Sequence, residues 1–148
     1  ETALEIYPAK DEEQMLDSSK RLLGDSLFGA PSYYAARAMA DRGEDIYFYH
    51  FNQKPSGKAG EILGAFHASE IAYVFGVGGL GPIEDPELSR IMLAYWTNFS
   101  KIGNPNGDDI PDWETMKLNK DTWHLLGPKI GQENISRMNI YNLLRRIS

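Results

Sequence analysis

The run Ile46-Tyr47-Phe48-Tyr49-His50-Phe51 constrains the fold of this 148-residue chain most strongly. It has the length of one strand, is rich in aromatic residues and is nearly all apolar. A strand with one face in water would instead alternate apolar and polar residues. The run therefore predicts a strand that is covered on both faces, as in a sheet that lies between helices.

Helical patterns flank this strand on both sides in the sequence. Helices are expected at residues 11–23, 30–42, 70–75, 86–101 and 136–147, a second short strand at 122–126, and a polar loop at 52–62. Gly24, Gly43 and Gly103 follow three of the helical patterns, and we expect each of them to end a helix. The order of elements predicts an α/β layer structure, and one or two strands make only an incomplete sheet.

Composition and charge exclude several classes of function. The formal net charge is −6, and Arg145-Arg146 is the longest basic stretch, so we expect no nucleic-acid partner. We expect no membrane span, because no apolar run has the necessary length. The chain has no cysteine, which excludes disulfides and thiolate metal sites. Whether the protein is cytoplasmic or secreted stays open.

The sequence predicts neither a metal site nor a phosphate loop. The acidic residues of the turn 108–112 lack the regular alternation and the closing glutamate of a calcium loop. His50 and His124 fall in strand-like runs, and nothing in the sequence pairs them as ligands. The glycine-rich segment 76–82 lacks the Lys-Ser/Thr pair of a phosphate-binding loop.

The segment from Gly64 to Gly76 carries the first candidate for chemistry. It places His67 in a loop after the first strand, with Glu70 three residues later. Catalytic groups in open α/β sheets follow the carboxyl ends of strands, which suits a general base. The alternatives are a packed imidazole ring for His67 and, for Glu70, a carboxylate that interacts favourably with a helix N-terminus.

Tyr73 and Phe75 follow closely and are candidates for the wall of a substrate pocket, because such pockets are mostly apolar. Ordinary core packing explains the same two residues equally well.

The segment from Gly64 to Gly76 resembles the histidine segment of the type-B carboxylesterase/lipase family, which includes the cholinesterases. The family pattern runs roughly Gly-x-x-His-Gly-x-Glu-Ile-x-Tyr/Phe-Val-Phe-Gly. Residues 46–51 resemble its Val-Tyr-x-Tyr-x-Phe strand, and residues 95–107 resemble its Tyr-Trp-x-Asn-Phe-Ala-x-x-Gly-Asp-Pro-Asn-Gly. Pro111-Asp112-Trp113 stands where the family usually carries a Trp-Pro pair. The resemblance runs from about Asp25 to Trp123.

The resemblance implies an α/β-hydrolase fold that hydrolyses small carboxylic esters without a cofactor or metal. His67 would be the general base of a Ser-His-Glu/Asp triad. Glu70 would support the triad through hydrogen bonds, often by way of water. An aspartate is common in the family at the place of Asp25, buried near the histidine loop. A capping or turn-forming role for Asp25 is an equal alternative.

The chain also departs from the family pattern. It contains no Gly-x-Ser-x-Gly motif, and the triad acid and the oxyanion-hole glycines are expected upstream of it. Ala68 replaces the usual glycine after the histidine. We therefore expect residues 1–148 to form the C-terminal part, about a quarter, of a single hydrolase domain. Alone it should be inactive, with apolar helix faces and a sheet edge exposed, and its partner should be the N-terminal remainder.

Two other classes of function stay open from the sequence. One is an adhesion protein that kept the fold and lost its nucleophile, as neuroligin-like proteins do. The other is a small α/β binding module in which the histidine loop is coincidental.

Overall fold

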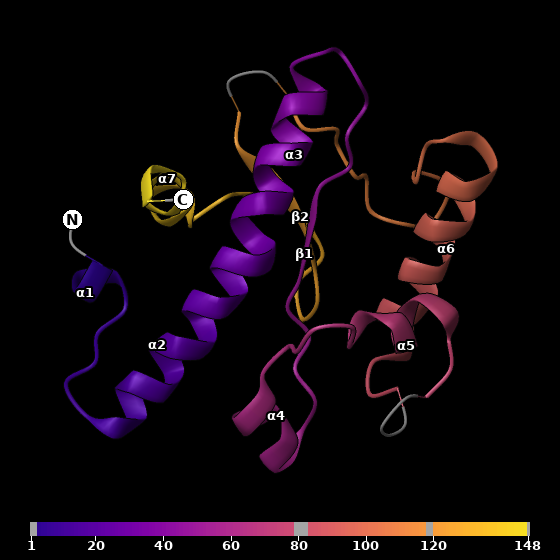
Figure 1. Cartoon of the computed structure of the whole chain (residues 1–148). Coiled ribbons are helices and arrows are strands. Elements are labelled where there is room, and N and C mark those ends of the chain that lie inside the picture. The colour runs from indigo at the N-terminus through magenta and orange to yellow at the C-terminus, as the bar shows by residue number, and fades with distance from the viewer. Residues whose placement is uncertain (1–2, 79–82, 118–119, 148) are drawn as a thin grey trace. The chain divides into compact units, whose positions relative to one another are not determined.

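The computed structural model describes residues 3–78, 83–117 and 120–147. In chain order the elements are α1 (Ala3–Ile6), α2 (Glu12–Gly24), the π-helix η1 (Asp25–Gly29), α3 (Ala30–Ala40), β1 (Tyr49–Phe51), α4 (Gly57–Leu63), α5 (Glu70–Phe75), α6 (Pro86–Ile102), β2 (Thr122–Leu126), β3 (Gly131–Asn134) and α7 (Met138–Ile147) (Figure 1). The predicted α/β class is therefore confirmed.

The chain divides into two compact units. Unit 1 comprises Glu1–Ile46, Met116–Asp121 and Asn134–Ser148, and unit 2 comprises Tyr47–Thr115 and Thr122–Glu133. Unit 1 is helical, whereas the paired strands, α4, α5 and α6 belong to unit 2.

In unit 1, α2, η1 and α3 form one unbroken run of helix (Figure 1). The run begins where the Asp11 carboxylate accepts the Gln14 N–H at 2.8 Å. Our expectation that Gly24 ends the first helix was wrong. Gly24 keeps right-handed helical angles (φ −61°, ψ −45°), and the backbone widens into a π-turn in which the Ala30 N–H bonds to the Asp25 carbonyl.

Aromatic contacts join α3 to α7 in the core of unit 1. The rings of Tyr33 and Tyr141 lie 5.7 Å apart, and both residues are buried. Gly29 has to be small, because a Cβ at this position would lie 2.8 Å from the Tyr141 hydroxyl oxygen. The lack of a side chain at the end of η1 thus lets Tyr141 pack closely against it.

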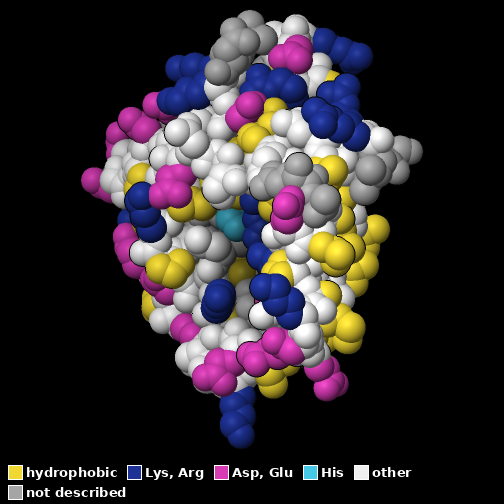
Figure 2. All heavy atoms as spheres, turned by 90° about the vertical axis from the view of Figure 1, so that its left-hand side faces the viewer, with side chains coloured by type: hydrophobic (Ala, Val, Ile, Leu, Met, Phe, Trp, Pro, Cys, Tyr) yellow, Lys and Arg dark blue, Asp and Glu magenta, His cyan; other side chains and the backbone are white. Residues whose placement is uncertain are grey.

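The outer side of α2 and η1 exposes apolar side chains. Among the large hydrophobic residues that are at least 40% exposed, this stretch contributes Met15, Leu16, Leu22, Leu23, Leu27 and Phe28. Figure 2 shows apolar side chains gathered at the surface among charged ones. The predicted exposure of apolar helix faces is confirmed for this stretch.

Unit 2 is built on a three-stranded sheet with the order β1-β2-β3. β1 and β2 are parallel, with Tyr49 opposite His124 and Phe51 opposite Leu126. The first strand is shorter than predicted and only half-buried, whereas all five residues of β2 are buried. β1 lies at the edge of the described sheet and β2 at its centre, so the doubly covered strand is β2.

The predicted polar loop at 52–62 was wrong in part, because α4 lies within it. The helix contains two glycines, which weaken the helical pattern in the sequence. Gly60 is nevertheless required, since a Cβ there would meet the Pro55 carbonyl oxygen at 1.7 Å. The Glu84 carboxylate also accepts the Ser56 N–H at 2.9 Å, and this bond fixes the start of the helix.

The short helix α5 and the long helix α6 are confirmed close to their predicted ranges. α6 begins where the Asp85 carboxylate accepts the Leu88 N–H at 2.9 Å, and Pro86 occupies its first turn. It ends at Gly103, which has left-handed angles (φ 71°). Of the predicted glycine-rich segment 76–82, residues 79–82 lie outside the described residues. No helix among the described residues is long and apolar enough to cross a membrane.

His124 of β2 is fully buried in the core of unit 2. Its ring is stacked on Trp113 at 4.9 Å, and its Nε2 lies 3.2 Å from the Tyr95 hydroxyl. Burial lowers the pKa of His124 from its usual 6.5 to about 4, although Gln132 partly opposes this shift by hydrogen bonding. The imidazole is therefore neutral in the folded chain above this pH.

We predict that the free energy of unfolding falls as the pH is lowered from 6.5 towards 4. Over this range His124 binds a proton in the unfolded chain but stays neutral in the folded chain, so a lower pH favours unfolding. The full shift corresponds to about 3 kcal/mol. Urea unfolding followed between pH 7 and pH 4.5 checks this. His124→Gln should flatten the slope, and a slope that stays equally steep in this variant would contradict the prediction.

Candidate functional site

His67 begins a three-residue turn, residues 67–69, that joins α4 to α5 in unit 2. Its side chain is exposed. Gly64 leaves α4 with φ +63°, a conformation that glycine adopts without strain. The turn is closed by Ser69, whose backbone N–H and hydroxyl both donate to the Phe66 carbonyl, at 3.1 and 2.6 Å. The candidate base therefore lies on a short, hydrogen-bonded turn.

Ala68, directly after the histidine, has φ +69°. This left-handed conformation costs a residue with a Cβ roughly 1–2 kcal/mol. Glycine adopts it freely, which gives a physical reason for the glycine that the resemblance places here. In this chain an alanine holds this conformation, and the turn carries the strain.

Glu70 is the first residue of α5, and its carboxylate acts on Tyr49 of β1. Burial, and after it the negative charge of Glu70, raises the pKa of the Tyr49 hydroxyl. The Tyr49 ring packs edge-on against Trp96 at 5.3 Å and Trp113 at 5.9 Å. The negative charge of Glu70 therefore acts on the Tyr49 hydroxyl. Glu70 itself lies three residues after His67 in the sequence.

The two candidate pocket residues have different environments. Tyr73 is buried in the core of unit 2, 5.5 Å from the ring of Phe51, and its carbonyl accepts the Ser89 hydroxyl at 2.8 Å. Phe75 is 67% exposed. Tyr73 is therefore a packing residue of this unit, whereas a place for Phe75 in a pocket wall remains a prediction.

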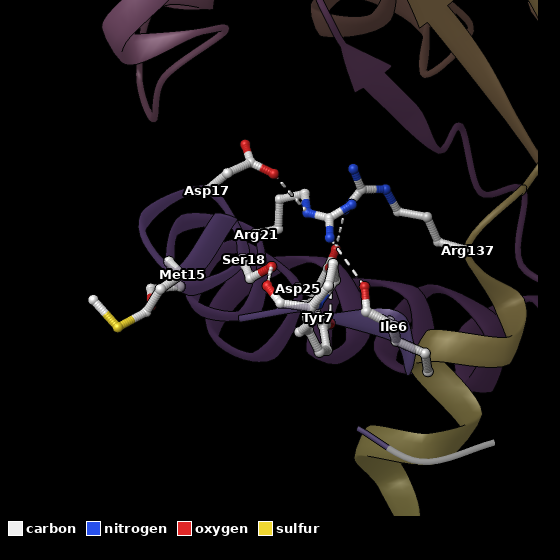
Figure 3. A network of polar contacts seen from close by, with 10 residues as sticks. Ile6, Tyr7, Met15, Asp17, Ser18, Arg21, Asp25 and Arg137 are labelled. Atoms are coloured by element: carbon white, nitrogen blue, oxygen red, sulfur yellow. Dashed lines mark hydrogen bonds and ion pairs between the residues drawn. The ribbon is translucent and has the colours of Figure 1, made fainter. Parts of the chain in front are cut away.

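Asp25 is buried in unit 1, where it starts η1. Figure 3 shows its carboxylate between Tyr7 and the guanidinium of Arg137. The Tyr7 hydroxyl donates to Oδ2 at 3.0 Å, and Arg137 forms an ion pair with Oδ1. Burial, and then the charge of Asp25, raises the pKa of Tyr7 to about 12. Asp25 thus ties together η1, the residue after α1 and the segment before α7.

Arg21 extends this network at the surface (Figure 3). Its guanidinium donates to the Ile6 carbonyl at 3.0 Å and pairs with Asp17 at 3.3 Å. Nearby, the Ser18 hydroxyl donates to the Pro8 carbonyl at 2.6 Å. These bonds hold the segment after α1 against α2, so the surroundings of Asp25 are built from its own unit.

Sequence reasoning missed the partners of Glu70 and Asp25. The alternation Tyr47-x-Tyr49-x-Phe51 places the three aromatic residues on one side of the strand, which is a usable signal for Tyr49. Arg137 lies 112 residues from Asp25, and no local pattern connects the two. Within the described part of the chain, no three His, Asp or Glu side chains are arranged to hold a metal ion.

A parallel strand pair packed with helices, with a histidine turn in the connection between the two strands, is consistent with a portion of an α/β-hydrolase fold. A model of the carboxylesterase family matches residues 1–142, and the chain belongs to this family. The family and fold expected from the resemblance are thereby confirmed.

Curated relatives agree with this assignment. The chain is 40% identical over 121 residues to a fatty acyl-CoA hydrolase precursor, medium chain, of Anas platyrhynchos, a match that covers 78% of this chain and 22% of the relative. It is 38% identical over 113 residues to the liver carboxylesterase of Sus scrofa, covering 72% and 19%. It is 36% identical over 132 residues to carboxylesterase 5A of Homo sapiens, covering 80% and 23%. The chain thus spans about a fifth of the length of these relatives.

We predict that Glu70→Gln makes the Tyr49 hydroxyl easier to ionise. Removing the negative charge removes one of the two causes that raise the pKa of Tyr49, so this pKa should fall. NMR of tyrosine labelled at Cζ, followed through an alkaline titration, measures it directly. Glu61→Gln on α4 is the matched control, and an unchanged Tyr49 titration in Glu70→Gln would contradict the contact.

We predict that Arg137→Met destabilises the chain by about 3 kcal/mol, because it leaves the buried Asp25 carboxylate without its cation. Arg21→Met, which removes an exposed ion pair, should cost less than about 1 kcal/mol. Urea unfolding at pH 7 compares the two variants. Adding Asp25→Asn to Arg137→Met should restore part of the loss. Equal losses of unfolding free energy in the two arginine variants would show that the buried ion pair stabilises the chain no more than the exposed one.

Proposed function

We propose that this chain contributes the general acid/base histidine, His67, of a serine carboxylesterase, and that units 1 and 2 both belong to one hydrolase domain. The intact enzyme would hydrolyse small carboxylic esters through an acyl-serine intermediate. The observation that carries the proposal is the strained histidine turn, followed at once by Glu70 with Tyr49 beside it, in a chain that matches the carboxylesterase family over residues 1–142.

The chemistry proposed for His67 is proton transfer at a ring nitrogen. The neutral imidazole removes the proton from a serine hydroxyl as the oxygen attacks the ester carbonyl, and it returns the proton to the leaving alcohol. In the second half it removes a proton from water, and the attack of that water on the acyl-serine releases the acid. The exposed position of His67 on its turn supports this role, because a base has to reach its substrate.

For Glu70 we propose a supporting role beside the triad. Its carboxylate opens α5 directly after the turn that carries His67, and it is close enough to Tyr49 of β1 to act on the charge of that phenol. Asp25 has a different role in our proposal. Its bonds to Tyr7 and Arg137 favour stabilisation of unit 1 over any contact with substrate.

The partner that we propose is the N-terminal remainder of the same hydrolase. The 148 residues contain no Gly-x-Ser-x-Gly motif, so the nucleophile has to come from elsewhere. Two features support a large covering partner: the exposed apolar residues of α2 and η1, and the position of β1 at the edge of the described sheet.

Two proteins test the proposal together, the isolated chain and a chimaera. The isolated chain should show no serine-dependent hydrolysis of p-nitrophenyl acetate above the buffer rate. A chimaera in which residues 1–142 replace the matching segment of the liver carboxylesterase of Sus scrofa should hydrolyse the ester. His67→Gln in the chimaera should lower kcat by roughly 10³-fold or more.

His50→Gln is the matched control, since His50 lies on β1 of the same unit and should leave kcat of the chimaera within about threefold of the parent. A fluorophosphonate probe counts the serines that react in each variant. Turnover by the isolated chain that this probe blocks would overturn the proposed need for a partner. Full activity of the His67→Gln chimaera would overturn the role of His67.

A further inference from the structure

Ser69 occupies the position before α5 at which a serine usually caps the helix. A capping serine has extended backbone angles, and its oxygen accepts an N–H from the first turn of the helix. Ser69 instead has φ −66° and ψ −23° and makes no side-chain capping bond. Its hydroxyl points backward along the chain and donates to the Phe66 carbonyl at 2.6 Å.

Both donors of Ser69 converge on one acceptor. The backbone N–H of Ser69 donates to the same Phe66 carbonyl at 3.1 Å, so two hydrogen bonds span His67 and Ala68. One residue later, the Ile71 N–H donates to the Ala68 carbonyl at 3.2 Å. The turn that carries His67 is therefore closed by its own short-range bonds.

These bonds act against the strain at Ala68. With φ +69°, Ala68 would relax towards a right-handed or extended conformation if the turn opened, and that change would re-aim the preceding histidine. The hydroxyl bond of Ser69 raises the cost of this opening. Because its hydroxyl is used in this bond, Ser69 does not cap α5. The first turn of α5 carries the carboxylate of Glu70, which interacts favourably with the helix N-terminus.

We infer that Ser69 is a positioning residue for His67, whose hydroxyl holds the strained turn closed and keeps the imidazole in one orientation. The inference rests on the proposed function for its catalytic meaning. The mechanical part concerns residues 66–71 alone and can be measured on the chain itself.

The first test is NMR on the intact 148-residue chain. In the parent, three-bond couplings should report one dominant χ1 rotamer for His67, and the amide of residue 69 should be protected from hydrogen exchange. Ser69→Ala should give averaged couplings at His67 and amide exchange at residue 69 that is faster by about five- to tenfold. Ser69→Thr keeps the hydroxyl and should restore both values.

Ser100 provides the matched control. Its hydroxyl donates to the Trp96 carbonyl at 2.6 Å within α6, so Ser100→Ala removes a bond of the same kind away from the turn. This variant should leave His67 unchanged. In an Ala68→Gly background the effect of Ser69→Ala should shrink, because glycine carries no strain at this φ. An unchanged His67 in Ser69→Ala, or an equal effect in the glycine background, would overturn the inference.

The second test separates this inference from the proposed function. In the chimaera with the Sus scrofa enzyme, Ser69→Ala should lower kcat by about five- to tenfold with KM unchanged, and Ser69→Thr should restore kcat. If His67→Gln leaves the chimaera active while the NMR effects hold, the proposed function fails and the positioning stands. If His67→Gln removes activity while Ser69→Ala leaves the couplings and kcat unchanged, only the inference about Ser69 fails.

Discussion

The packing of α6 against its neighbours is the constraint on which the candidate site depends. One face of this helix packs into the core of unit 2. On this face lie Leu88, Met92 and Tyr95, which meet residues of α5, Trp113 and Leu126 of β2. Because α5 is only six residues long, it has little stability of its own, and its position follows from this core. Glu70 opens α5, so the carboxylate beside Tyr49 is fixed by helix packing far more than by local sequence.

Asp25 in unit 1 and His124 in unit 2 are both buried ionisable side chains, and the two are stabilised in different ways. In unit 1 the charge of Asp25 is compensated by a cation and a hydroxyl from distant parts of the chain. In unit 2, His124 remains neutral and its ring is covered by an aromatic neighbour. A paired charge loses its compensation when one partner is removed, whereas a neutral histidine is destabilising only when acid supplies a proton. The two units therefore respond differently to mutation and to pH.

Local signals in the sequence predicted the elements that local chemistry determines. α6 has a proline at its first residue and a glycine directly after its last one, so its bounds were found to within a residue. Gly24 failed as a stop signal, because the π-turn after it is held by Tyr7 and Arg137 through Asp25, and neither partner is visible locally. β1 was predicted too long: its pairing with β2 covers only Tyr49–Phe51, and the partner strand that decides this pairing lies some seventy residues later in the sequence.

The histidine turn shows how a site residue can be found from sequence while its support is not. The motif located His67 and Glu70, but the replacement of glycine by Ala68 looked minor until the backbone angle was known. At φ +69° an alanine makes the turn costlier to hold, and the extra hydroxyl bond of Ser69 is a local compensation. Ala68 and Ser69 should be considered as a pair, because the hydroxyl bond of Ser69 opposes the opening that would relieve the strain at Ala68. The strained backbone at Ala68 and the hydrogen bond that opposes it lie within residues 66–69, and comparing sequences one position at a time does not reveal this connection.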